Sequence, residues 1–393
     1  MQQRDWLKEI RSMAAGLENS GIVDVFNYGR NRPGLVPFWV GESDLPTPAF
    51  ISDAAIEALQ AGHTFYTYQR GIPQLRQAVA DYLGRAFATN IDPERIIITG
   101  SGMQGLVETM QLLVGPGDNV VVVAPVWPNI MAAAEMQDAS VKPVTLDFTD
   151  GVWQLDLERL FAAVGPRTSA IFINSPGNPT GWLLSRDDMI AVRDFCRERD
   201  LWIIADEVYN RFVYDQPRGF SFLEIMQPDE KLIVTNTFSK NWLMTGWRVG
   251  WVVIPNAPVL GQIYENLVQY NTSGVATFLQ YGCIAALEQG DGLVREMVER
   301  CRVGRDIVCT ALAELPRVEF ARPDGAFYVF FRVTGEHDCV AFAKRMVDEA
   351  NVGLAPGSAF GAGGRGFQRL CFASSHTTLQ TGVERLAAAI KAL

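Results

Sequence analysis

The chain has 393 residues, of which 48% are hydrophobic and 20% are charged, and its formal net charge is −10. This composition is typical of a globular protein with a sizeable core, and the length favours one large domain with a smaller one. The acidic balance argues against a general binder of nucleic acid or membrane surfaces, because such a protein needs a basic face.

The N-terminal stretch mixes acidic and basic residues and lacks the long apolar core of a signal peptide. Its apolar residues recur at helical spacing and predict a short amphipathic helix. These residues are Trp6, Ile10, Met13 and Leu17. No stretch of the sequence approaches the length of a membrane span. We therefore expect a cytoplasmic protein.

Six cysteines and three histidines are scattered along the sequence. No two cysteines form a C-x-x-C pair, so reduced buried thiols are expected rather than disulfides or zinc. His63, His337 and His376 are far apart in sequence, which argues against a histidine metal site or a Ser-His-Asp triad. We expect no metal.

Between about Pro93 and Pro255, short β-branched runs alternate with longer helical patterns. The runs typical of strands are residues 95–98, 119–123, 142–146, 169–173, 201–205, 232–234 and 249–254. The helical patterns, which continue beyond this region, are 103–114, 186–199, 260–268, 277–289 and 293–315. Continuous apolar strands are required in a sheet that is buried on both faces. The alternation therefore predicts an α/β fold with a mostly parallel central sheet and helices on both faces.

The pattern changes toward the carboxyl end. Strand-like runs at 326–331 and 369–372 alternate with helical patterns at 340–350 and 378–393. This order predicts a smaller α+β unit. We expect residues 48–289 to form the large domain, and residues 1–47 with 290–393 to form the small one.

Lys240 and Arg248 lie in the segment T-F-S-K-N-W-L-M-T-G-W-R-V-G-W, directly after a buried apolar run. Dehydration at such a place lowers the pKa of the Lys240 amine. A free amine can form a Schiff base with an aldehyde cofactor, and a permanent cation eight residues later suits a phosphate. Together they describe a site for pyridoxal phosphate. An ordinary surface lysine and ion-paired arginine are the alternative.

A glycine-rich turn, G-S-G-M-Q-G at residues 100–105, follows a predicted strand and opens a helix. It matches the dinucleotide fingerprint, and so favours a nicotinamide-dependent oxidoreductase as a rival function. That fingerprint also needs an acid at the end of the next strand, where this chain has A-P-V-W. A single phosphate group at the helix N-terminus explains the turn as well.

Polar residues follow two further predicted strands. Asp206, in A-D-E-V-Y, can hold the proton of a pyridine nitrogen, and Tyr209 can reach a ring hydroxyl. Asn178, in N-S-P-G-N-P-T-G, can donate its amide hydrogen to a ring oxygen. The alternatives are a helix-capping aspartate with a core tyrosine, and a plain turn.

Two more residues stand in apolar surroundings that suit a ligand. Trp127, in A-P-V-W-P, can stack on a flat heterocycle or pack in the core. Arg369, in Q-R-L-C-F-A, needs an anion, and a bidentate carboxylate fits it as well as a structural ion pair does.

In this order, the motifs resemble those of the fold-type I aminotransferases that use pyridoxal phosphate, and the resemblance covers nearly the whole chain. It includes G-E-S-D-L-P-T-P at residues 41–48, Y-T-Y-Q-R-G-I-P-Q-L-R at 66–76, S-G-M-Q-G at 101–105, N-P-T-G at 178–181, D-E-V-Y at 206–209, S-K at 239–240, G-W-R-V-G at 246–250, P-G-S-A-F-G at 356–361 and R-L at 369–370.

The resemblance implies a role for each residue at the cofactor ring. Lys240 would be the Schiff-base lysine and proton shuttle, Asp206 the partner of the pyridine nitrogen, and Trp127 the stacking residue. Asn178 and Tyr209 would hold the ring oxygen. The residues implied for the phosphate are Ser101, Gly102, Met103, Thr237 or Ser239, and Arg248.

The resemblance also implies how substrate and partner bind. Arg369, the Gly41 backbone and Asn178 would grip the α-carboxylate of an amino acid or a 2-oxo acid. Tyr66 would reach the phosphate of a neighbouring subunit, so a homodimer is expected. The implied reaction is a two-step amino transfer, with a β-eliminating C–S lyase on the same fold as the nearer alternative.

One departure concerns substrate choice. One branch of the family, which acts on aspartate, has a lysine where this chain has Met103, and this cation would hold the distal carboxylate. Met103 is apolar, so we expect neutral or aromatic donors to be preferred over dicarboxylic ones. Arg30 or Arg32 remains an alternative source of that charge.

Overall fold

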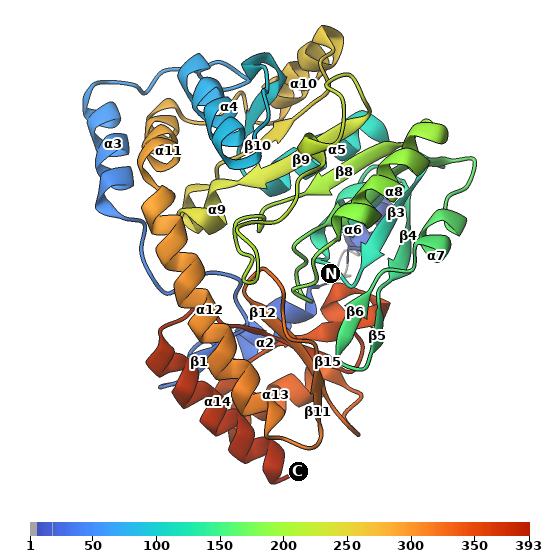
Figure 1. Ribbon diagram of the computed structural model, residues 1–393, viewed down its shortest axis with the longest axis vertical. Helices are drawn as coiled ribbons and strands as arrows, with labels where there is room; N and C mark the ends of the chain where they lie inside the picture. The colour runs from blue at the N-terminus through green and yellow to red at the C-terminus, as the bar shows by residue number, and fades with distance from the viewer. Residues whose placement is uncertain (1–5, 18) are drawn as a thin grey trace, which may run out of the picture.

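The computed structural model describes residues 6–17 and 19–393, and two sheets organise them (Figure 1). The larger sheet has the strand order β2-β10-β9-β8-β7-β3-β4. Its strands are β2 (Ile96–Thr99), β3 (Asn119–Ala124), β4 (Ser140–Thr145), β7 (Thr168–Asn174), β8 (Trp202–Asp206), β9 (Leu232–Thr237) and β10 (Gly250–Val253). All neighbouring pairs are parallel except those of β10, which runs antiparallel to β2 and β9. The predicted α/β fold is confirmed.

Both faces of this sheet are buried, as the apolar strands predict. Along β3, Val120 and Val122 join a core cluster with helices α5 and α6, while Val121 and Val123 join one with α4, α8 and α11. Successive side chains of a strand point to opposite faces, so a four-valine run serves two layers. The helices of this unit are α3 (Ala49–Gln60), α4 (Pro73–Phe87), α5 (Gly102–Leu113), α6 (Asn129–Glu135), α7 (Leu157–Ala162), α8 (Arg186–Glu198), α9 (Phe238–Asn241), α10 (Pro258–Asn271) and α11 (Thr277–Gln289).

The second unit is α+β, as predicted, and is built on an antiparallel sheet of order β11-β12-β15-β14. Its strands are β11 (Val318–Phe320), β12 (Tyr328–Val333), β14 (Ala355–Pro356) and β15 (Phe367–Cys371), and its helices are α12 (Asp291–Ala313), α13 (Cys339–Glu349) and α14 (His376–Lys391). In Figure 1 the long helix α12 runs from the end of α11 down along this unit, beside α14.

An early segment of the chain returns to the second unit. Helix α2 (Gly21–Gly29) packs on α13, and β1 (Val36–Pro37) pairs in parallel with β13 (Val352–Gly353). The blue α2 therefore lies among the orange and red elements in Figure 1. Shorter elements complete the chain: the β5 (Asp147–Thr149) and β6 (Val152–Gln154) hairpin, and the 3₁₀ helices η2 (Pro93–Arg95), η3 (Phe222–Glu224), η4 (Thr245–Trp247), η5 (Gly357–Phe360) and η6 (Ala362–Gly364).

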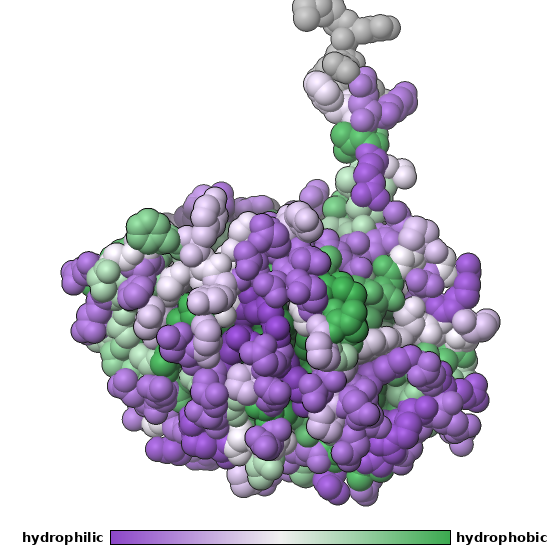
Figure 2. All heavy atoms as spheres, turned by 90° about the horizontal axis from the view of Figure 1, so that it is seen from above, coloured by the Kyte–Doolittle hydropathy of each residue, from purple (hydrophilic) through white to green (hydrophobic). Residues whose placement is uncertain are grey.

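The predicted N-terminal amphipathic helix is wrong in its continuity. The segment forms only the 3₁₀ turn η1 (Trp6–Lys8) and a single turn α1 (Ser12–Ala15), which Arg11 separates with an extended ψ of 135°. The segment projects from the body (Figure 2), and Trp6 is 63% exposed. A short helix needs a buried apolar face to be stable, and this one has none. Among the described residues, no helix is both long and apolar enough to cross a membrane.

Candidate active site

A cavity of about 410 Å³ lies at the carboxyl ends of β7, β8 and β9, where open α/β sheets bind their ligands. The strand register brings polar residues to this edge, since Asn174 at the end of β7 is paired with Asp206 at the end of β8, and Asp206 with Thr235 of β9. Tyr328 and Arg369 of the second sheet close the cavity from the other side. The site therefore lies where the two units meet.

Lys240 lies in α9, the short helix that directly follows β9. Its Nζ donates a hydrogen bond to the Gly41 carbonyl at 2.7 Å. Burial lowers the pKa of the Lys240 amine to about 8, and the nearby cations Arg369 and Arg248 act in the same direction. A lysine in this state is a nucleophile and a proton acceptor near neutral pH.

Asp206 is buried at the end of β8, and its carboxyl accepts a hydrogen bond from the Val208 N–H at 3.3 Å. It forms no ion pair with the residues that the structure describes. Burial raises the pKa of this carboxyl to about 7, against the opposing effects of the Val208 N–H and Lys240. A buried carboxyl without an ion-pair partner suits a proton donor from a ligand, and a pyridinium N–H is one.

The N-terminus of α5 and the β9–β10 connection form an end of the cavity that suits an anion. The first N–H groups of α5, from Gly102 and Met103, have no acceptor within the helix. Thr237 and Ser239, whose hydroxyls bond each other at 2.9 Å, line the same end with the exposed Arg248. Hydroxyls, helix N–H groups and a guanidinium fit a phosphate.

Arg369, on β15, is 3% exposed. Its guanidinium donates to the Asn178 side-chain oxygen at 3.0 Å and to the Trp39 carbonyl, while its Nε has no partner. The residues described include no carboxylate that pairs with it. A buried cation held only by neutral groups is costly unless a ligand brings an anion, and its fork geometry matches a carboxylate.

The structure brings most of the predicted site residues into one cavity: Gly41, Gly102, Met103, Trp127, Asn178, Asp206, Tyr209, Thr237, Ser239, Lys240, Arg248 and Arg369. Ser101 does not line it, because its side chain caps α5 by accepting from the Gln104 N–H at 3.1 Å. Tyr66 also lies outside this cavity, and it is 96% exposed.

The sequence analysis missed several residues that line the cavity. The hydroxyl of Tyr328 lies 2.8 Å from that of Tyr209, and helix α2 supplies an apolar wall of Ile22, Val23 and Phe26. Tyr328 lies in an apolar run typical of a strand, and a tyrosine in such a run is predicted to pack in the core. The α2 residues show no sign in the sequence of lining a cavity whose other walls include residues as distant as Lys240 and Arg369.

The chain matches the family model of the class I and II aminotransferases over residues 33–386. It is 34% identical to an aspartate aminotransferase of Thermotoga maritima over 352 residues, which are 90% of each chain. It is also 33% identical to aromatic-amino-acid aminotransferase 2 of Thermococcus litoralis, over 95% of this chain and 96% of that protein. The chain belongs to the class I and II aminotransferases.

Solved structures agree with this membership. A mutant of Thermus thermophilus aspartate aminotransferase superimposes with a TM-score of 0.90 at 30% identity, over 97% of this chain and 99% of that one. This aminotransferase is therefore an enzyme that moves amino groups between amino acids and 2-oxo acids, with pyridoxal 5'-phosphate as cofactor. Asp206 without an ion pair among the described residues, the dehydrated Lys240 and the end of the cavity that suits an anion fit that cofactor. The rival oxidoreductase function of the glycine-rich turn is wrong.

Proposed function

We propose that this aminotransferase prefers amino donors with neutral or aromatic side chains over dicarboxylic donors. The observation that carries the proposal is the wall of the cavity, which is apolar where α2 and Met103 face it. An apolar wall stabilises an apolar or aromatic side chain by removing it from water, and offers a distal carboxylate no partner.

The charges around the cavity support this preference. Lys240, Arg248 and Arg369 are the only cations among the described residues that line the cavity, and each already has a proposed task. Arg32, considered above as a source of charge, lies outside the cavity and pairs with Asp348 at 2.5 Å. Arg30 also lies outside the cavity. By contrast, Glu42 lines the wall of the cavity. A second carboxylate on the donor would meet the Glu42 carboxylate, which repels it.

The relatives leave this choice open. Similar proteins carry the names of aspartate aminotransferase, aromatic-amino-acid aminotransferase and arginine–pyruvate transaminase, the last at 35% identity over 88% of each chain. One scaffold therefore serves acidic, aromatic and basic donors, and the side-chain wall decides between them.

The proposed tasks of the catalytic groups follow from their chemistry. Bound pyridoxal phosphate withdraws electrons from the substrate Cα and so acidifies its hydrogen. The Lys240 amine, freed by the substrate, would take the Cα proton and return it two atoms further along, at the cofactor C4′. Asp206 holds the proton on the pyridine nitrogen, and Arg369 with Asn178 and the Gly41 backbone holds the α-carboxylate in place for this transfer.

The remaining cofactor contacts complete the proposal. Trp127 stacks on the ring, while Asn178 and Tyr209 donate to its oxygen. The groups proposed to hold the phosphate are the backbone of Ser101, Gly102 and Met103, the hydroxyls of Thr237 or Ser239, and Arg248.

We further propose a homodimer in which Tyr66 reaches the phosphate in its partner's site. Tyr66, Phe65 and Tyr270 are strongly exposed aromatic side chains, which a second copy can cover. We retain residues 48–289 as the cofactor-binding domain, and 1–47 with 290–393 as the domain that closes on the substrate. All six cysteines are buried and free, which suits the cytoplasm.

The first experiment mixes cofactor-loaded protein with a panel of amino acids in the absence of any 2-oxo acid. The visible absorbance of the cofactor's aldehyde form should disappear fastest with neutral or aromatic donors, and a 2-oxo acid should restore it. A faster reaction with aspartate or glutamate overturns the proposed preference. Release of pyruvate and ammonia from a β-substituted donor, with spontaneous return of the absorbance, would instead show a C–S lyase.

The variant Met103→Lys tests the wall itself. A cation there should raise kcat/KM for aspartate relative to phenylalanine by about 10-fold, because one partly buried ion pair contributes about 1.4 kcal/mol. Met103→Gln is the matched control, because it is polar and of similar size but uncharged. An equal gain with glutamine would mean that the cation is not responsible.

A mixing experiment tests the shared site. If Tyr66 serves the partner's site, dimers formed from Lys240→Ala and Tyr66→Phe subunits contain one intact site, with Lys240 from one chain and Tyr66 from the other. Their cofactor affinity at that site should match the unmodified protein. Affinity that stays at the Tyr66→Phe level would show that Tyr66 acts within its own subunit.

A further inference from the structure

Tyr328 has no task in the proposed function, yet it is fully buried and faces the cavity from the first position of β12. Its hydroxyl lies 2.8 Å from the Tyr209 hydroxyl, and the two rings meet edge to face at 86°. We infer that Tyr328 is a positioning residue, which orients the Tyr209 hydroxyl as a donor to the cofactor's ring oxygen. This inference rests on the role proposed above for Tyr209.

A count of hydrogens gives the direction of the bond. Burial raises the pKa of both the Tyr209 and Tyr328 hydroxyls, so each keeps its single hydrogen. Tyr209 can give its hydrogen either to Tyr328 or to the ring oxygen, but not to both. The ring oxygen is the stronger acceptor, because it carries negative charge. The Tyr328 hydrogen then goes to Tyr209, which has no other hydroxyl neighbour among the described residues.

The resulting chain of donors runs from Tyr328 through Tyr209 to the ring oxygen. Each bond polarises the next in a buried site, so the Tyr328 donor strengthens the Tyr209 donor. Without the Tyr328 hydroxyl, Tyr209 would lose both this polarisation and the contact that fixes its rotation.

The opposite side of Tyr328 touches the groups that hold the substrate. The Arg369 guanidinium lies 4.5 Å from the centroid of the Tyr328 ring, which is a cation–π contact. Gly41 has no room for a side chain because the Tyr328 hydroxyl occupies that place, and the Gly41 carbonyl accepts the Lys240 hydrogen bond. Tyr328 thus fixes Tyr209 relative to the carboxylate-binding groups, across the boundary between the two sheets.

The test is Tyr328→Phe, with the visible absorbance of the bound cofactor followed against pH. A negative ring oxygen retains a proton on the neighbouring lysine nitrogen, and donors to that oxygen weaken this effect. Loss of the Tyr328 hydroxyl should therefore raise the pKa of the spectral transition, by about half a unit. It should also lower kcat about 5-fold, the loss that one hydrogen bond brings, with less change in KM.

Two further variants make the result specific. In a Tyr209→Phe background, Tyr328→Phe should add no further shift, because its only route to the ring is through Tyr209. Tyr264→Phe is the matched control: this buried tyrosine bonds the Gly105 carbonyl and the Thr109 hydroxyl outside the cavity, and its loss should leave the spectral pKa unchanged.

The outcomes separate this inference from the function on which it rests. No spectral shift in Tyr328→Phe, or an equal shift with and without the Tyr209 hydroxyl, overturns the positioning role. If Tyr209→Phe itself produces no spectral shift, the proposed role of Tyr209 fails first, and the inference falls with it. A shift in Tyr264→Phe as large as that in Tyr328→Phe would also refute it, since the effect would then follow any buried hydroxyl.

Discussion

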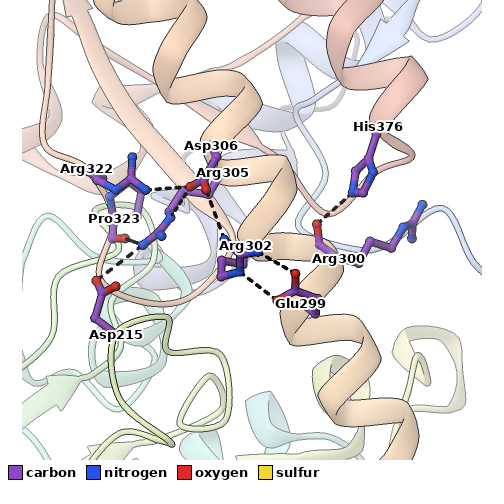
Figure 3. A network of polar contacts seen from close by, with 9 residues as sticks. All are labelled: Asp215, Glu299, Arg300, Arg302, Arg305, Asp306, Arg322, Pro323 and His376. Carbon is purple, nitrogen blue, oxygen red and sulfur yellow. Dashed lines mark hydrogen bonds and ion pairs between the residues drawn. The ribbon is translucent and has the colours of Figure 1, made fainter.

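Two arginines of this aminotransferase are equally buried, each 3% exposed, but they have opposite surroundings. Arg305, on α12, lies 3.2 Å from the Asp306 carboxylate and 3.7 Å from that of Asp215, and it donates to the Pro323 carbonyl at 3.1 Å (Figure 3). Arg369 has an amide and a carbonyl for partners, and no acid among the residues described.

The difference indicates that Arg305 stabilises the fold, whereas Arg369 is available to bind a ligand. The contacts of Arg305 are complete within the chain, and they join α12 to the loop before β12 and to the segment around Asp215 (Figure 3). The unfinished pairing of Arg369 occurs in the same cavity as a lysine and an aspartate whose pKa values burial has moved toward neutrality. Buried charges without partners mark the place that a ligand completes.

The largest expected effect is that of Lys240→Ala. No other lysine of the described residues lines the cavity, so kcat/KM for transamination should fall by at least about 10⁴-fold. A coupled assay of 2-oxo-acid formation measures this, and mass spectrometry after borohydride reduction should no longer find cofactor attached to the chain. Lys231→Ala removes a surface lysine paired with Asp200 and should change neither. Activity within 10-fold of normal in Lys240→Ala would contradict the assignment.

Arg369→Met should separate binding from stability. Loss of a bidentate, charged contact to the α-carboxylate should lower kcat/KM about 10²-fold, largely through KM. The same change removes a buried cation without an acidic partner, so the melting temperature of the substrate-free protein should not fall. Steady-state kinetics and thermal melts give the two readouts. A clear loss of stability would show that Arg369 is a structural residue like Arg305.

Arg305→Met should have the reverse profile. Asp215 is well exposed and Asp306 partly so, hence water can solvate both carboxylates, and the loss is mainly that of the Pro323 contact and the pairing. The free energy of unfolding in urea should fall by about 2 kcal/mol. The kcat/KM of the folded, cofactor-loaded variant should stay within about 2-fold. A large loss of kcat/KM with unchanged stability would remove the distinction between the two arginines.

Asp206→Asn should change no more than the pH dependence of stability, in the cofactor-free protein. Because the folded-state pKa of Asp206 is raised to about 7, the folded protein binds more protons than the unfolded chain between about pH 4 and pH 7. Stability from this group is present below pH 4 and is lost as the pH rises through 7. The asparagine variant should therefore melt a few degrees higher than the unmodified protein at pH 8, and equally at pH 4. Asp229→Asn makes the same substitution at an exposed carboxylate and serves as the control. Parallel stability curves for Asp206→Asn and the unmodified protein would contradict the raised pKa.

The sequence predicted the central sheet well because burial on both faces demands uninterrupted apolar runs. The run at residues 119–123 differs from β3 by one residue, and the helix at 277–289 coincides with α11. The site residues at the carboxyl ends of these strands could be predicted for the same reason, since the topology of a parallel sheet gathers them at one edge.

What the sequence did not reveal depends on contacts between distant segments. β1 and β13 are each two residues long, which is too short for an alternating hydrophobic pattern to predict the pairing of Val36 with Val352. The contact between the Tyr328 and Tyr209 hydroxyls could not be predicted, because it forms only when β12 packs against the end of β8. The N-terminal pattern predicted a continuous helix, but neither of the two short helical turns that the structure describes there has a fully buried residue.

The pairing of β2 with the antiparallel strand β10 affects the order in which parts of the cavity can form during protein synthesis. β2 leads into the glycine-rich turn proposed to bind the phosphate, and within the described sheet its one neighbour is β10, about 150 residues later. A nascent chain therefore cannot pair β2 with β10 until Val253 has emerged from the exit tunnel, and Arg369 emerges more than 100 residues later still. Because contacts of such long sequence separation form late, the cavity can take up its cofactor only after β10 and β15 have both been synthesised.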